Sequence, residues 1–334
     1  MYLFLKGYKM SVLIKNNRQS NFELLRIFSM FLIVLHHCNT HGVFSYWHNN
    51  VSILHHINNF IVFLFSSGGK VGVTLFVLLT GYFSCTQNFS LKKWIYIYLK
   101  TAFFAVFMCL IYFFIDSEQA KVSLVYSIFP FTHNAYWFIT SYLLLQIFSP
   151  LLNIILKTIS PKLIQRYVII GGTLWILFPL FSFNLGYSIL LYFMYLYILG
   201  GALRLNYINF SHKYFSILFW VFFIYFLSVE LMLIWNIGPE INLWLLFSHV
   251  ELNLPYTFFV SLALFCLFKN IKVQSAWINW IAGSMLGVYL LHDSNLVRTH
   301  LWHTILAVDT SMQSPYFMVT YYFYQYLWGV YSVG

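Results

Sequence analysis

Arg26 and His37 are the residues near the start of the chain whose types and spacing indicate chemistry, and both lie in one long apolar run, Asn21 to Cys38. Eleven residues turn a helix through about 1,100°, so the two side chains share a face and stand about 16 Å apart along the axis. A neutral imidazole can take a proton from a hydroxyl group, and a guanidinium can bind phosphate. Because an ionisable side chain inside a membrane helix is destabilising, we expect this pair to face a cavity, a partner or a ligand rather than lipid.

The element that positions this pair belongs to a membrane protein by composition. The chain is 61% hydrophobic and 22% aromatic, with only 8% charged residues. Its apolar runs lack the alternation of barrel strands, and a segment in hydrocarbon must close its own backbone hydrogen bonds. We therefore predict an all-α fold, a polytopic transmembrane helical bundle of about ten spans. No internal repeat is visible, which favours a cytoplasmic N-terminal segment, 1–21, followed by one domain, 22–334.

The predicted spans are Phe22 to Thr40, Val71 to Ser84, Trp94 to Ile115, Tyr136 to Leu156, Tyr167 to Phe183, Tyr187 to Arg204, Tyr214 to Trp235, Leu254 to Phe268, Trp277 to His292 and Pro315 to Val333. The ambiguous stretch is Val51 to Ser67, which is apolar but carries His55 and His56. Counting it as a span would reverse the side of every later loop.

The distribution of basic residues over the loops decides this ambiguity. If Val51 to Ser67 does not cross, the loops of one side hold Lys6, Lys9, Lys15, Arg18, Lys92, Lys93, Lys157, Lys162, Arg166, Arg204, Lys213, Lys269 and Lys272. The other side keeps Lys70, Lys121 and Arg298. The positive-inside rule makes the first side cytoplasmic and places both termini there. The net charge of +10 then reflects topology, and because the bases form no contiguous patch we expect no nucleic-acid partner.

The cysteines indicate no metal site. Cys38, Cys85, Cys109 and Cys266 are widely separated, with no CxxC or other metal-ligand spacing. We interpret them as core thiols and predict no metal cofactor.

Four strings of residues occur in order over most of the chain and carry a resemblance. They are Asn21-Phe-Glu-Leu-Leu-Arg26 leading to His37, Gly69-Lys-Val-Gly-Val-Thr-Leu-Phe-Val-Leu-Leu-Thr-Gly81-Tyr-Phe, Tyr136-Trp137-Phe138 with Ser149-Pro150-Leu-Leu-Asn153, and Gly287-Val-Tyr-Leu-Leu-His292-Asp293-Ser-Asn-Leu-Val-Arg298-Thr-His-Leu-Trp302. Together they resemble the acyltransferase-3 family of integral membrane acyltransferases. The last is similar to the penultimate-helix motif of members that O-acetylate bacterial surface polysaccharides.

The resemblance implies an O-acetyltransferase in the bacterial cytoplasmic membrane, with acetyl-CoA as donor substrate. The implied acceptor is a hydroxyl of a lipid-linked, surface or exported glycan, and the bilayer is the remaining partner; the oligomeric state stays open. His37 matches the family's catalytic position. It acts there either as general base for the acceptor hydroxyl or as a transient acetyl carrier. The alternative for His37 is a core histidine bonded to a backbone carbonyl.

The donor side of this hypothesis rests on three basic residues. Arg26 would bind phosphate or the thioester region of coenzyme A, unless it is an interfacial anchor or an ion-pair partner of Glu23. Lys92 and Lys93 correspond to a basic region that relatives often fill with arginines. They would attract the phosphates of coenzyme A, or serve only as topology anchors.

The acceptor side is predicted around His292 and Asp293, with Arg298 close behind. A carboxylate beside an imidazole fixes its tautomer and raises its basicity, so this cluster is expected to take part in catalysis or acceptor binding rather than to be an interfacial pair. We expect His36 to be structural. Glu230, within the seventh predicted span, has no identified partner.

Gly69, Gly72 and Gly81 are expected to allow close helix packing. Tyr136, Trp137 and Phe138 are expected to form part of an aromatic belt or to stack on sugar. A lipid-linked sugar flippase or a polysaccharide polymerase remains the alternative function. The sequence shows neither the inverted repeat typical of a transporter or flippase nor the large loop expected of a polymerase, so it favours neither alternative.

Overall fold

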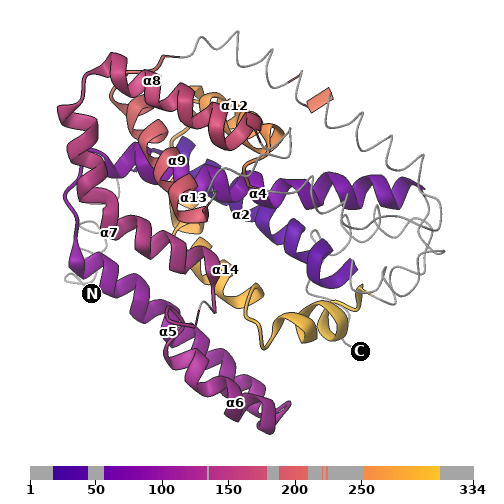
Figure 1. The fold of residues 1–334 in the computed structure, drawn as a ribbon. Helices are drawn as coiled ribbons and strands as arrows, with labels where there is room; N and C mark the ends of the chain where they lie inside the picture. Colours follow the sequence, from indigo (N-terminus) through magenta and orange to yellow (C-terminus); the bar gives the residue numbers. More distant parts are fainter. Residues whose placement is uncertain are drawn as a thin grey trace, which may run out of the picture.

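The computed structural model describes residues 18–43, 56–133, 135–178, 188–209, 220, 223–224 and 252–308, and within these ranges every regular element is a helix (Figure 1). The α-helices are α2 Ser20–His37, α4 His56–Ser84, α5 Leu91–Phe113, α6 Ser117–Ile128, α7 Trp137–Thr158, α8 Pro161–Gly172, α9 Ile189–Arg204, α12 Pro255–Asn270, α13 Ala276–Ala282 and α14 Met285–His292. Three π-helical segments, Cys38–Val43, Thr173–Leu177 and His300–Ile305, accompany them.

Three of the described helices are long and apolar enough to cross a membrane: Ser20–Val43, Leu91–Phe113 and Trp137–Thr158. Two shorter apolar helices are Ile189–Arg204 and Pro255–Asn270. A 23-residue helix such as α5 rises about 34 Å, enough for a hydrocarbon layer of about 30 Å. Some predictions fall on residues that the structure does not describe: the span Pro315 to Val333, Glu230 and His55. The same holds for almost all of the predicted span Tyr214 to Trp235.

Glycines let α2, α4 and α9 approach closely. A Cβ atom on Gly72 would collide with the backbone carbonyl of Ser29 on α2, and one on Gly69 would collide with the side chain of His36. On the far part of α4, a Cβ atom on Gly81 would collide with the backbone of Tyr197 on α9. The predicted role of these three glycines in close packing is therefore confirmed, and this packing fixes α2 against the centre of the molecule.

Buried polar side chains tie the helix ends together. The start of α2 is fastened to α13, because the Ser20 hydroxyl donates to Asn279 Oδ1 at 3.0 Å and accepts from the Ser275 amide at 3.0 Å. Asn153 joins its own helix, α7, to α4 and α9. Its amide donates to the Ser84 carbonyl at 3.0 Å, and its oxygen accepts from the Tyr197 hydroxyl at 2.8 Å.

The structure corrects the predicted second span. Helix α4 begins at His56 rather than near Val71, and it runs for 29 residues without a break. The stretch Val51 to Ser67 is therefore, from His56 onward, the first part of this helix and not a separate element. Lys70, which we placed in a loop, lies within α4.

Two further predictions about elements were wrong. The predicted span Trp277 to His292 is two short helices, because α13 ends at Ala282 with Gly283 as its C-cap. The amides of Gly283 and Ser284 donate to carbonyls three residues earlier, at 3.1 and 3.0 Å, instead of four. Helix α6 lies in a segment that we treated as a loop. Asp116 caps it by accepting from the amides of Glu118 and Gln119, and the helix folds back alongside α5 (Figure 1).

Candidate active site

Two histidines from distant parts of the chain meet at the centre of the candidate site. His37 is the last residue of α2 and His292 the last of α14, and both are buried, at 8% and 6% exposure. His37 Nδ1 lies 2.9 Å from His292 Nε2. The structure thus brings together the two imidazoles that the sequence placed on different predicted spans.

A backbone carbonyl fixes where the protons of this pair reside. His292 Nδ1 lies 2.6 Å from the Val288 carbonyl oxygen, which can only accept, so this nitrogen carries the proton. In the neutral ring His292 Nε2 is then an acceptor, and His37 donates to it from Nδ1. The lone pair of His37 is therefore on Nε2, the form in which an imidazole can take a proton from a substrate.

The Asp293 carboxylate lies beside this hydrogen bond. Its Oδ1 atom is 3.5 Å from His37 Nδ1 and 3.6 Å from a guanidinium nitrogen of Arg298. Burial raises the pKa of the Asp293 carboxyl to about 6, although Tyr289 and Arg298 counteract this. In its ionised form the carboxylate would stabilise positive charge that develops on His37 when Nε2 gains a proton.

His41 is a member of this cluster that the sequence analysis missed. It lies one turn beyond His37, and its Nε2 atom accepts from Arg298 at 3.2 Å and stands 4.0 Å from Asp293 Oδ1. Its carbonyl accepts from His303 Nε2 at 3.0 Å. The i, i+4 spacing from His37 was the available signal, since residues at that spacing share a helix face.

Lys70 and Tyr289 were missed for different reasons. The ammonium group of Lys70 stands 5.5 Å from the centroid of the Trp137 ring, in the middle of α4 rather than in a loop. The Tyr289 ring lies 6.5 Å from that of His37, and its buried hydroxyl makes no hydrogen bond of standard geometry. Tyrosines are common throughout the sequence, so no pattern singled out Tyr289.

His36, expected to be structural, turns away from His37. Its Nδ1 atom lies 2.5 Å from the Ser66 carbonyl on α4, and its ring packs beside Gly69. This contact anchors α2 to α4 directly next to the paired imidazoles. His56 begins α4, and its side chain lies outside the described residues.

Arg26 and Lys93 share a second site, a cavity of about 220 Å³ between α2, α5 and α7. Arg26 pairs with Glu23 at 2.6 Å and lies 5.6 Å from the centroid of the Phe83 ring. Lys92, the other predicted donor-binding residue, is exposed and does not line this cavity. The ion pair with Glu23, which we considered as an alternative role for Arg26, is present, and the guanidinium group also lines the cavity.

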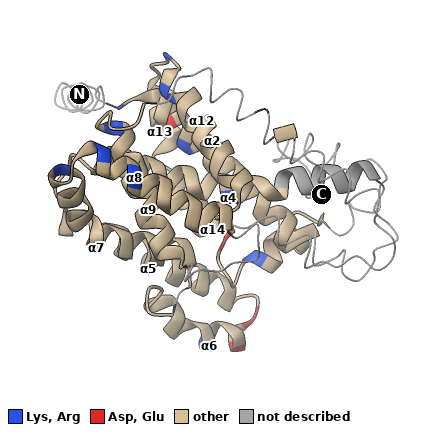
Figure 2. Ribbon diagram, turned by 45° about the horizontal axis from the view of Figure 1, so that its top comes forward, with Lys and Arg blue, Asp and Glu red and all other residues tan. Residues whose placement is uncertain are grey.

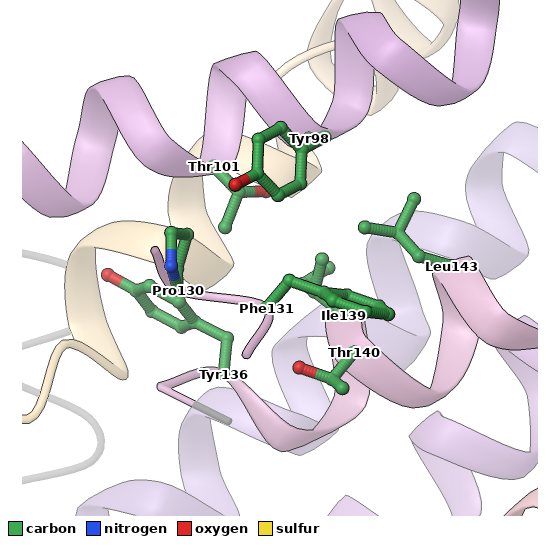
Figure 3. Close-up of a pocket in the computed structure, with 8 residues that line it drawn as sticks. All are labelled: Tyr98, Thr101, Pro130, Phe131, Tyr136, Ile139, Thr140 and Leu143. Atoms are coloured by element: carbon green, nitrogen blue, oxygen red, sulfur yellow. The ribbon is translucent and has the colours of Figure 1, made fainter. Parts of the chain in front are cut away.

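Three cavities lie one after another along the line where α5 and α7 face each other, which we call the seam between these helices. Beyond the cavity of Arg26 and Lys93, a small one of about 10 Å³ lies between Thr101 and Tyr98 of α5 and Ile139 of α7 (Figure 3). The next cavity has a volume of about 210 Å³ and is bordered by Tyr136, α6 and Ser294. The seam therefore runs from the cavity of Arg26 and Lys93 to the cavity beside Ser294, the residue that follows Asp293.

The cluster has atoms that could bind a metal ion, but its electrostatics oppose one. One ligand atom each from His37, His41 and Asp293 lies within 4.8 Å of the others. Arg298 donates to the same His41 nitrogen and lies close to the same carboxylate. A fixed positive charge among the ligand atoms repels a divalent cation, so the arrangement favours proton transfer over metal binding.

A bundle of apolar helices that holds a buried imidazole pair beside a carboxylate is typical of membrane proteins that transfer protons. The model of the acyltransferase-3 family, an acyltransferase domain, matches residues 19–333. The chain therefore belongs to this family of membrane acyltransferases, as the sequence motifs predicted. No curated protein and no solved structure matches the chain.

Proposed function

We propose that this membrane acyltransferase moves an acetyl group from cytoplasmic acetyl-CoA to a hydroxyl of a bacterial surface or exported polysaccharide. The observation that supports this most is the hydrogen-bonded chain from the Val288 carbonyl through His292 to His37, since it leaves His37 Nε2 as a buried base. A sugar hydroxyl is a poor nucleophile at neutral pH and needs such a base.

In the proposed reaction the acceptor oxygen forms a bond to the thioester carbonyl carbon while its proton passes to His37 Nε2. The carbon–sulfur bond then breaks, and the imidazolium returns the proton to the leaving thiolate, so that coenzyme A is released as a thiol. Asp293 and His292 hold His37 and stabilise its charged form. In the alternative that remains open, His37 itself carries the acetyl group between two such steps.

The donor is proposed to bind at the cavity of Arg26 and Lys93, with Lys92 as an exposed positive charge next to Lys93 in the sequence. Positive charge at a partly open cavity suits the phosphates of coenzyme A. Since Arg26 and His37 are about 16 Å apart along the helix, the acetyl group must travel into the bundle to reach His37. The seam between α5 and α7 offers a direction for this movement.

The orientation proposed for the molecule places the donor cavity on the cytoplasmic side. Figure 2 shows many of the Lys and Arg residues gathered at one end of the bundle, near α8 and α13. The positive-inside rule makes this end cytoplasmic and puts the N-terminus there. Asp293 then lies toward the outer side, where an exported glycan is available, in a bundle of about ten spans.

The test is NMR of surface polysaccharide from cells that express the wild type, His37→Ala or no protein, with matched protein levels in the membrane. O-acetyl signals are expected with the wild type and lost in the other two. His36→Gln is the control, because a neighbouring side chain is changed while the amide can still donate to the Ser66 carbonyl.

Identical acetylation in all samples would overturn the proposal. Loss of the polysaccharide itself in cells without the protein would instead favour the flippase or the polymerase. Retained acetylation in His37→Ala alone would leave the reaction in place and remove His37 from it.

A further inference from the structure

The cavity of about 210 Å³ beside Asp293 has a lining that suits a particular kind of ligand. It is formed by one face of α6, the segment that leads into α7, one residue of α5 and the segment that follows α14. The lining residues are Ala105, Gln119, Ser123, Tyr126, Ser127, His133, Ala135, Tyr136, Ser294, Asn295 and Leu296. None of these described lining residues is Asp, Glu, Lys or Arg, so the polar groups of the lining are amides, hydroxyls and an imidazole.

Several of these groups retain hydrogen-bonding capacity toward the cavity. Gln119 Oε1 accepts from the Tyr112 hydroxyl at 3.0 Å, which leaves its amide hydrogens as donors. His133 Nδ1 lies 3.1 Å from the Phe129 carbonyl and 3.1 Å from the Thr132 hydroxyl, so Nε2 is an acceptor in one neutral tautomer and a donor in the other. Ser123 and Asn295 offer both donors and acceptors. A mixture of neutral donors and acceptors suits hydroxyl groups, each of which both donates and accepts.

Aromatic rings close one side of the same cavity. The Tyr126 and His133 rings meet edge to face, with centroids 4.7 Å apart, and Tyr136 is held in place because its hydroxyl donates to the Leu290 carbonyl at 3.0 Å. The apolar face of a sugar ring packs on such rings, while its hydroxyls reach the amides. The volume is smaller than the roughly 300 Å³ of the smallest drug-sized pockets, which fits a single sugar unit.

The position of the cavity relates it to the paired histidines. Ser294 follows Asp293 directly, so its Cα atom lies about 3.8 Å from that of Asp293, and Asp293 Oδ1 is 3.5 Å from His37 Nδ1. The carbonyl that holds Tyr136 belongs to Leu290, within the same short helix as His292. A ligand in the cavity is therefore adjacent to the residues proposed to act on the acceptor.

We propose that this cavity is the acceptor subsite and that it binds an uncharged sugar unit of the glycan, such as a neutral hexose or an N-acetylhexosamine, rather than a uronic acid or a phosphorylated sugar. This inference rests on the proposed function. An anionic sugar would bring its charge into a cavity whose described lining residues include no Lys or Arg. Helix α6, absent from the sequence-based prediction, then determines which glycan is modified.

The first test is to locate the acetyl group in the polysaccharide of the strain that carries the gene. NMR of material from the wild type and from cells without the protein identifies the sugar unit that bears the enzyme-dependent acetyl group. An uncharged unit is expected. An acetyl group on a uronic acid or a phosphorylated sugar would overturn the subsite proposal and leave the proposed function in place, whereas no enzyme-dependent acetylation on any sugar would overturn the proposed function.

The second test changes the lining. Gln119→Ala combined with Asn295→Ala, and separately Ser123→Leu, are expected to lower the acetyl content about tenfold, the equivalent of one or two lost hydrogen bonds. Binding of labelled coenzyme A to the purified full chain should stay unchanged in both. Glu118→Ala is the matched control, since Glu118 lies on α6 but is exposed and outside the lining.

Wild-type acetylation in both lining variants would overturn the subsite proposal. Loss of coenzyme A binding in both would also overturn it, because the lining residues would then support the fold rather than the acceptor. If only the double variant loses coenzyme A binding, the acetyl content of the Ser123→Leu variant decides. A lowered content supports the subsite proposal, and the wild-type content overturns it.

Discussion

At the scale of single residues, the orientation of two imidazole rings is the feature with the most chemical content. The Val288 carbonyl sets the tautomer of His292, and His292 in turn sets that of His37. His37 was predicted from its helical phase with Arg26 and from the family motif. The tautomer was not, because it depends on which groups meet in space.

Replacement of His37 by Ala is expected to lower the rate of acyl transfer by about 10²–10⁴, the range that a positioned general base contributes. Transfer of labelled acetyl groups from acetyl-CoA to the isolated polysaccharide measures this rate. Labelled coenzyme A should still bind, since Arg26 and Lys93 line a separate cavity. A variant with the wild-type rate would show that another residue is the base.

A comparison of His292→Gln with His292→Leu tests the tautomer itself. The Gln side chain offers an oxygen that can accept from His37 Nδ1, whereas Leu offers no acceptor. The loss of one buried hydrogen bond corresponds to about a tenfold change in rate. We therefore expect the Leu variant to be about tenfold slower than the Gln variant in the same assay. Equal rates in the two variants would contradict the proposed tautomer.

At the scale of elements, the site depends on how α2 packs against α4. The glycine strings of the sequence predicted this close approach. The starts and ends of other elements were harder to predict. Polar residues at the start of α4 concealed its continuity, and the break after Ala282 depends on local backbone hydrogen bonds of Gly283 and Ser284. We placed Lys70 in a loop because the polar residues before it concealed that α4 is continuous.

Gly72→Val is expected to destabilise the protein by about 1–3 kcal/mol, the usual effect of overpacking. The added side chain would meet the Ser29 carbonyl and the Ile33 side chain. Thermal unfolding of the purified chain in detergent should show a lowered Tm. Gly287→Ala is the control, because a Cβ atom there meets Phe104 at 3.9 Å, an ordinary contact. Equal Tm values for the two variants would contradict the packing described here.

At the scale of the whole molecule, the two ends of the bundle differ in charge and in proposed function. The excess of Lys and Arg near α8 and α13 (Figure 2) marks the end proposed to face the cytoplasm. The composition and the loop charges were sufficient to predict a helical membrane protein. They did not predict α6 or its cavity, because α6 is too short and too polar for a span, although Asp116 followed three residues later by Gln119 is a signal for the start of a helix.

Cysteine labelling tests this orientation. In a chain whose four native cysteines are replaced, Lys162→Cys and Lys121→Cys are expected to react on opposite sides of the membrane. Both positions are exposed, at the start of α8 and on α6. A membrane-impermeant maleimide added to intact cells should label the cysteine at position 121 and spare that at position 162. Labelling of both positions from outside, or only of position 162, would contradict the orientation.

The narrow middle of the seam between α5 and α7 has a consequence for what can pass through the protein at rest. The cavity there, about 10 Å³ in volume, has room for about one water molecule at most. The described part of the seam therefore has no room for a continuous file of water, along which protons could hop across a bilayer. It has no room for an acetyl group either, so in the proposed function Ile139 and the side chains that face it must move apart whenever a donor passes this point.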